Sequence, residues 1–299
     1  MVLFTFKVFG QTDFLTKAKS YYNVDSNIIY GEKHLQQCIA STYNSKGIIN
    51  AYRYVVSNYF NKGKYTHAKK MIQDMLFLSY RKHDKEMEYV GIGLLGDFEK
   101  YSTNYSKAVN FYLIAYNGLE KGRYWENLCR STIDLIELNR AIAKYNDAEL
   151  YIKQAFKLFK EHQLNDPTIL VRLYSRTAAV KNETRTLELI DSSIVYSKLA
   201  LKINQQLKNK NDEAITWNEL GYSYRHLKNI DTAEYCFNIA EKIWFESGID
   251  ISAINAISNR AALYAFYKVK QQEVIPLYLK IIETVKNKNL NYDLDNVYK

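Results

Sequence analysis

The stretch Trp217–Ala240, WNELGYSYRHLKNIDTAEYCFNIA, decides how this sequence folds. It places Ala233 and Ala240 seven residues apart, on one face of an α-helix, which predicts a seam where two helices approach closely. Gly221 predicts another close contact, because a side chain at that position would hold two helices apart. The wider gaps are expected to be filled by the aromatic residues of the stretch, Trp217, Tyr224 and Phe237.

The pattern around Ala233 recurs along most of the chain. Anchor positions fall at residues 68, 108, 148, 193, 233 and, by extension, 273, so that the steps are 40, 40, 45, 40 and 40 residues. Before and after each anchor, apolar residues recur every three or four positions, which indicates two amphipathic helices per unit. Asp166-Pro167 is typical of a helix start, and Pro276 is expected near another start or at a bend. The repeats predict about six helix pairs over residues 48–290.

Composition supports a helical protein. The 299 residues include 47% hydrophobic residues but only 11 Gly and 2 Pro, too few for a turn-rich β fold. The net charge of +9 suits an anionic partner, yet the basic residues are scattered, so nucleic acid is an unlikely ligand. The three Cys lie far apart, outside any zinc-binding spacing, and none is expected to pair with a nearby His.

The opening stretch resembles the tetratricopeptide repeat (TPR). The residues that match the family pattern are Trp217, Leu220, Gly221, Tyr224, Ala233, Phe237 and Ala240, and a second match comprises Leu95, Gly96, Ala108, Tyr112 and Ala115. The period of about 40 residues exceeds the usual TPR period of roughly 34 and is similar to that of TPR sensor segments in bacterial signalling and transcription regulators. The resemblance implies an all-α fold, a right-handed α-solenoid of antiparallel helix pairs with a concave and a convex side.

The two ends of the sequence suggest a larger parent protein. Residues 1–47 read as a signal-like start followed by a degenerate first hairpin, and residues 291–299 as the start of a further, truncated helix. The compartment stays open between cytoplasmic and, if the apolar start is a signal remnant, periplasmic or exported. No stretch is long and apolar enough to be a transmembrane segment.

The sequence contains no catalytic constellation, metal-binding spacing or phosphate-binding loop, so we expect no enzyme, cofactor or metal. The TPR resemblance implies instead that side chains of each first helix face a concave groove. Asn can clamp a peptide backbone, Arg can bind a carboxylate, and Tyr offers an apolar face. The candidates are Asn50, Arg53 and Ser57; Gly93, Asp97 and Lys100; Ile133, Glu137 and Arg140; Asn218, Tyr222 and Arg225; and Asn255, Ser258 and Asn259.

These features favour a protein- or peptide-binding scaffold or sensory module, which acts through the concave groove as part of a larger signalling or regulatory protein. One alternative is a cytoplasmic peptide-pheromone receptor type regulator, ranked lower because residues 1–47 show no helix-turn-helix pattern. Another is a nucleic-acid-binding helical repeat protein, suggested by the net charge. The sequence does not indicate an oligomeric state.

Overall fold

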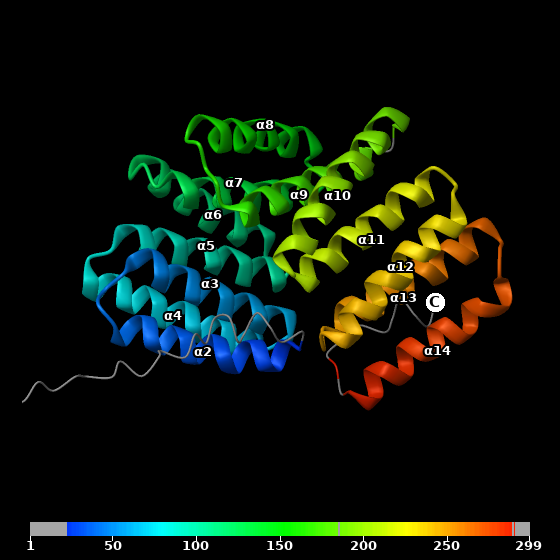
Figure 1. Ribbon diagram of the computed structural model, residues 1–299, viewed down its shortest axis with the longest axis horizontal. Helices are drawn as coiled ribbons and strands as arrows, with labels where there is room; N and C mark the ends of the chain where they lie inside the picture. Colours follow the sequence, from blue (N-terminus) through cyan, green and yellow to red (C-terminus); the bar gives the residue numbers. More distant parts are fainter. Residues whose placement is uncertain (1–22, 185, 289, 291–299) are drawn as a thin grey trace, which may run out of the picture.

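The computed structural model describes residues 23–184, 186–288 and 290 of the chain. This described part contains thirteen consecutive α-helices and no strand (Figure 1). The helices are α2 (Val24–Ala40), α3 (Ser45–Asn61), α4 (Tyr65–Lys82), α5 (Lys85–Tyr101), α6 (Tyr105–Lys121), α7 (Trp125–Ala141), α8 (Tyr145–Glu161), α9 (Pro167–Thr184), α10 (Leu187–Leu207), α11 (Lys210–His226), α12 (Ile230–Glu246), α13 (Asp250–Tyr267) and α14 (Gln271–Asn287). Each helix packs on the next, and α3 to α14 form six antiparallel pairs of a right-handed α-solenoid.

The turns between helices repeat more regularly than the sequence does. A residue with left-handed backbone ends the helix or follows its end at intervals of twenty positions, and only two of these residues are glycine. The positions are Gly63, His83, Thr103, Arg123, Ala143 and Gln163, then Lys208, Lys228, Gly248 and Lys268. The left-handed residue lets the following amides donate to the last carbonyls of the helix, so the chain reverses within three residues. Two such turns account for the period of 40.

Close helix contacts occur where the small residues predicted them. The anchors Ala68, Ala108, Ala148 and Ala233 are fully buried. A Cβ on Gly96 would lie 2.7 Å from Cδ1 of Tyr112, so the backbone of α5 lies directly against an aromatic ring of α6. The TPR-type packing of first against second helix is therefore confirmed by the structure.

The anchor expected at position 273 is wrong as a packing position. Glu273 lies in the first turn of α14 and is exposed, whereas Leu277, Ile281 and Val285 form the buried face of that helix. Lys270 adds a second left-handed residue to the turn before α14, so Glu273 is the third residue of its helix, whereas the earlier alanine anchors are each the fourth. Pro276 lies inside α14, five residues after its first residue.

The 45-residue step corresponds to a change in the middle of the solenoid. Helix α9 begins at Pro167 as predicted, with Asp166 accepting a hydrogen bond from the amide of Thr168 (2.9 Å). Helix α10 has 21 residues, against 17 or 18 in every other described helix. Its anchor is Ser193, whose hydroxyl donates to the carbonyl of Ala178 (2.9 Å). A hydrogen bond therefore joins α9 and α10 at the position where four of the other pairs have a buried alanine.

The solenoid curves far enough for its first and last parts to touch. The amide of Val24 donates to the carbonyl of Ser247, in the turn between α12 and α13 (2.8 Å). The Val24 side chain is buried in a core that includes Ala214, Trp244 and Ile249. In Figure 1 the end of α2 that the chain enters lies beside the lower end of α12. This contact turns the concave face into the inner wall of a nearly closed ring.

Some sequence-based predictions fall outside the described residues. These are the signal-like start, the first half of the degenerate hairpin and the truncated helix at residues 291–299. Within the described ranges, no helix combines the length and the apolar character that crossing a lipid bilayer requires.

Candidate ligand-binding site on the concave face

Two cavities lie on the concave side of the solenoid, and the first helix of each pair supplies most of both linings. The arginine cavity, about 560 Å³, is lined by residues of α2, α3, α5, α7, α9 and the start of α11, and by Ser247 and Ile249 from the ring contact. The asparagine cavity, about 630 Å³, is lined mainly by the later parts of α9, α11 and α13. Both volumes lie in the range of ordinary ligand sites.

Cationic side chains outnumber acidic ones in the lining of the arginine cavity. Seven cationic and four acidic side chains line it: Arg53, Lys100, Arg130, Arg172, Arg176, Lys208 and Lys210, with Asp97, Asp134, Asp166 and Asp212. Most of the arginines are bound to carboxylates. Arg130 donates to Asp166 (2.5 Å), and Arg172 donates to Asp134 (2.6 Å). Arg53 differs, because its guanidinium donates to the side-chain oxygen of Asn127 (3.1 Å).

Amide and hydroxyl groups dominate the asparagine cavity. Asn259 accepts a hydrogen bond from the hydroxyl of Tyr222 (2.7 Å) and donates to the side-chain oxygen of Asn218 (2.9 Å). Thus α11 and α13 are connected by side chains that face the groove. Beside them, the Arg225 guanidinium lies over the ring of Phe266, 5.6 Å from its centroid.

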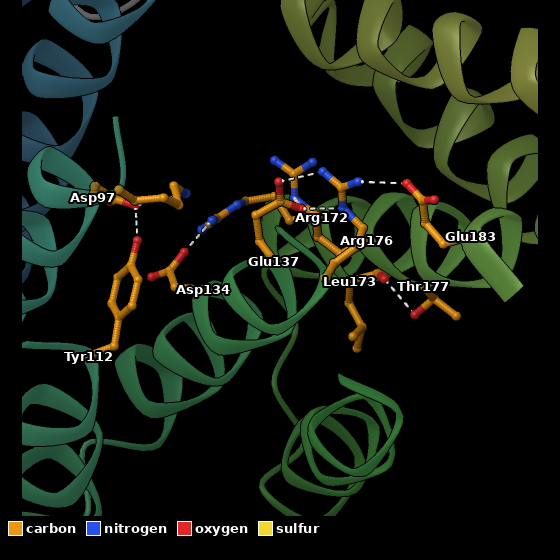
Figure 2. Close-up of polar contacts among 11 residues, drawn as sticks. Asp97, Tyr112, Asp134, Glu137, Arg172, Leu173, Arg176, Thr177 and Glu183 are labelled. Carbon is orange, nitrogen blue, oxygen red and sulfur yellow. Dashed lines mark hydrogen bonds and ion pairs between the residues drawn. The ribbon is translucent and has the colours of Figure 1, made fainter. Parts of the chain in front are cut away.

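A chain of ion pairs separates the two cavities. Glu137 is paired with Arg176, which lines the arginine cavity (3.4 Å), and with Arg140, which lines the asparagine cavity (2.9 Å). Arg140 also donates to Glu183 (3.2 Å). Figure 2 shows this row of charged groups, from the hydroxyl of Tyr112 pointing at Asp97 to Glu183 at the other end. The row joins α5, α7 and α9 across the concave wall.

The row shifts the acidity of its members. Burial alone would raise the pKa of Glu137, but Arg176, Arg140 and Lys100 outweigh burial and lower the pKa to about 2. Glu219 lies farther along the groove, and burial raises its pKa although Arg140 and Arg176 oppose the shift. Burial likewise raises the pKa of Asp212 in the first turn of α11. Glu137 is thus firmly ionised, whereas Glu219 and Asp212 gain protons more readily.

The structure brings most of the predicted site residues to these cavities. Arg53 and Asp97 line the arginine cavity, together with Asn50, Ser57 and Lys100. Six others line the asparagine cavity: Arg140, Asn218, Tyr222, Arg225, Asn255 and Asn259, together with Ser258. Glu137 lines neither cavity and lies between them in the ion-pair row. Whether these residues bind a ligand stays a prediction.

Two of the candidates do not face the groove. Ile133 is fully buried with Cys129 and Ile152, because α7 is covered by α8 and by α9 and has few free positions. Gly93 lines neither cavity, and a Cβ on it would meet the Cβ of Ala115 at 3.5 Å, so this position faces α6.

No groove residue of α9 was predicted from the sequence, although Arg172 and Arg176 both line the arginine cavity. The step before anchor 193 is five residues longer than the others, so the repeat did not indicate which residues of α9 face the groove. This helix also lacks the Leu-Gly pair that marks the packing face in α5 and α11. The spacing of the two arginines was an available signal, since residues four apart lie on the same face of a helix. Arg130 and Asp134 on α7 share that spacing and were missed as well.

One prediction about cysteine is wrong. Sγ of Cys38 lies 3.5 Å from Nε2 of His34, one turn earlier on α2. Cys129 and Cys236 are buried, and Cys38 is partly buried. The described residues contain no group of three or more His, Cys, Asp or Glu side chains placed to hold a metal ion.

Comparison with known proteins places the fold. No protein-family model matches the chain, and no curated protein matches its sequence. Among solved structures, a Rap protein complexed with Competence and Sporulation Factor is similar, with a TM-score of 0.61, 16% identity and coverage of 91% of this chain and 74% of that one. Aspartyl phosphate phosphatase F from Bacillus subtilis has a TM-score of 0.60, 14% identity and coverage of 91% and 68%. BtubC (BKLC) from P. vanneervenii has a TM-score of 0.51, 18% identity and coverage of 74% and 90%.

The chain therefore has the fold of the TPR-type helical repeat proteins. At these identities the likeness concerns the fold alone, and the ligand and the phosphatase named for two of the neighbours belong to those proteins.

Proposed function

We propose that this chain is a protein- or peptide-binding module that holds an extended segment of its partner along the concave face. The observation that carries the proposal is the row of side chains Asn218, Asn259 and Tyr222 on the wall of the asparagine cavity. No described residue accepts from the amide group Nδ2 of Asn218. An Asn side chain offers both a donor and an acceptor, as a peptide bond does, so it can pair with a bound backbone in place of water.

The groove also suits an extended ligand in its overall chemistry. Aromatic rings, amides and charged groups alternate along it, so that the backbone and the side chains of a peptide would each find partners. The ring contact through Val24 preorders the wall before any ligand arrives, which reduces the entropy lost on binding. As a part of a larger regulator, such a module would report the presence of its ligand through the curvature of the solenoid.

A direct test is selection from a display library of random twelve-residue peptides against the whole chain, followed by fluorescence anisotropy with the selected peptides. We expect the double variant Asn218→Ala, Arg225→Ala to weaken binding by about tenfold or more, since each side chain would lose a hydrogen-bond partner. The matched control is Asn110→Ala, an exposed residue of the second helix α6, which lines neither cavity. Selected peptides that bind the double variant as tightly as the native chain would place the site elsewhere.

The finer alternatives separate in the same experiment. A peptide-pheromone receptor type regulator would bind one free peptide tightly, whereas a scaffold would prefer a motif within longer partner segments. A nucleic-acid-binding protein would instead bind mixed-sequence RNA or DNA with an affinity that falls steeply as salt rises.

A further inference from the structure

Arg53 is a charged side chain of the arginine cavity for which the described structure provides no carboxylate. It extends from α3 and lines the cavity, and its guanidinium donates to Asn127. Its Nε atom is buried and has no hydrogen-bond partner among the described residues, which is also true of Nε of Arg130. The other three arginines of this cavity, Arg130, Arg172 and Arg176, each have an ion pair with an acidic residue.

The surroundings of Arg53 oppose its charge. Burial lowers the pKa of its guanidinium to about 10, and repulsion from Arg130 and Arg172 acts in the same direction. Asp134 and Asp97 partly offset these effects, but both already have cationic partners in Arg172 and Lys100. Arg53 is partly buried and lines the cavity, so a cation without its own counter-ion stands there within reach of a partner that arrives from outside.

We infer that the arginine cavity binds an anionic group of the ligand, a carboxylate or a phosphate, through the guanidinium of Arg53. The inference rests on the proposed function and specifies the ligand as an acidic or phosphorylated peptide. Seven cationic side chains line the cavity; carboxylates pair with most of them, but Arg53 has no ion pair of its own in the described structure, and its planar guanidinium can bind two oxygens of such a group at once. Helix α2 and the turn at Ser247 close one side of the cavity and keep the bound anion away from bulk water. The attraction between the anion and Arg53 is therefore screened less than it would be at the surface.

The test uses two anionic probes and one neutral probe at low salt. The probes are N-acetylated, amidated hexaglutamate as a source of carboxylates, sodium pyrophosphate as a source of phosphates, and hexaglutamine with the same blocked ends. Binding is measured by titration calorimetry and by the shift in melting temperature of the whole chain. We expect at least one anionic probe to bind and hexaglutamine not to bind. Binding of hexaglutamate would indicate acidic side chains, and binding of pyrophosphate would indicate phosphorylated ones.

The variants separate a ligand-binding Arg53 from a structural one. Arg53→Met should weaken binding of the anionic probe by about tenfold or more, whereas Arg123→Met, in an exposed turn between α6 and α7, should leave it unchanged. Without ligand, Arg53→Met should melt at the same temperature as the native chain or higher, because it removes an unpaired cation. Arg172→Met should melt lower, because it leaves Asp134 without its partner.

The inference is overturned if neither anionic probe binds, if Arg53→Met binds as the native chain does, or if Arg53→Met melts as low as Arg172→Met. Each of these results leaves peptide capture through Asn218 and Arg225 standing, because that proposal is tested with peptides of unrestricted sequence. Failure of the library selection together with anion binding would instead retain the anion site and remove the peptide groove.

Discussion

A methyl group on Gly221 would lie 2.4 Å from Cε1 of Phe237, whose ring is fully buried between α11 and its neighbours. The ring cannot withdraw without disturbing a close-packed core. Gly221 is therefore required by packing against α12, while the neighbouring Tyr222 faces the groove. Packing and recognition are carried by adjacent residues of one helix.

The first prediction tests this contact. Gly221→Ala should lower the free energy of unfolding by about 1–3 kcal/mol, because overpacking outweighs the better helix propensity of Ala. In a Phe237→Leu background the same change should cost less than half as much, because the clashing ring atom is gone. Urea denaturation of the four proteins of this double-mutant cycle measures the difference. An equal cost in both backgrounds would show that Phe237 is not the reason for the glycine.

The second prediction concerns the turns. Thr103 has a left-handed backbone (φ 60°), which is unfavourable for a β-branched residue. Thr103→Gly should raise the free energy of unfolding by about 0.5–1 kcal/mol, after the greater chain entropy of Gly is deducted. Thr66→Gly, in the first turn of α4, should lower stability by a comparable amount. Stability of Thr103→Gly below that of the native chain would contradict the strained turn.

The third prediction concerns pH. The pKa of Glu137 is lowered to about 2 by Arg176, Arg140 and Lys100 against the effect of burial, while a free Glu titrates near 4.5. Its ionised form therefore contributes stability above pH 4.5, and this contribution is lost as the pH falls toward 2. Glu137→Gln should be destabilised at pH 7, and its deficit relative to the native chain should shrink by on the order of 3 kcal/mol between pH 4.5 and pH 2.

The measurement for Glu137 is urea denaturation of both proteins across this pH range. Other carboxylates titrate in both proteins and cancel in the difference. Glu161→Gln serves as the control, because Glu161 is exposed and forms only a surface pair with Lys157 (3.8 Å). A deficit of Glu137→Gln that stays constant with pH would contradict the ion-pair row.

The fourth prediction concerns ring closure. Val24→Asp places a carboxylate in the core formed with Trp244 and Ile249, so the contact between the first and last parts of the solenoid should open. Small-angle X-ray scattering should then show a larger radius of gyration with unchanged helix content. Ile29→Asp, at an exposed position of the same helix, should leave the radius unchanged. An unchanged radius for Val24→Asp would mean that other contacts hold the ring together.

Much of the fold could be read from the sequence because its determinants are local. The alanines at 68, 108, 148 and 233 mark helix seams, and small residues can occupy such seams in any repeat. The anchor at 273 was wrong because the local geometry of the preceding turn shifts the helix. The turn before α14 contains a second left-handed residue, Lys270, so position 273 is the third residue of its helix, whereas Ala68 and Ala233 are the fourth of theirs.

The candidate site was only partly readable. Asn218, Tyr222 and Asn259 were predicted for the groove, but their hydrogen bonds were not. Asn259 bonds to Tyr222 and Asn218, which lie 37 and 41 residues earlier in the chain. The difference between Arg53 and Arg172 was not readable at all, since both are arginines on first helices. Helix α7 decides between them, because it presents the carboxylate of Asp134 to Arg172 and only the amide oxygen of Asn127 to Arg53.

The sequence by itself determined the repeating helix pairs, because helix periodicity and the fit of small against large side chains act between neighbours in the chain. Only the tertiary structure decided how far the solenoid curves, and therefore that Val24 reaches Ser247 and closes a cavity around Arg53. The curvature of the solenoid is the sum of small rotations between all six pairs. It therefore depends on every interface between pairs, and the sequence of a single repeat does not reveal it.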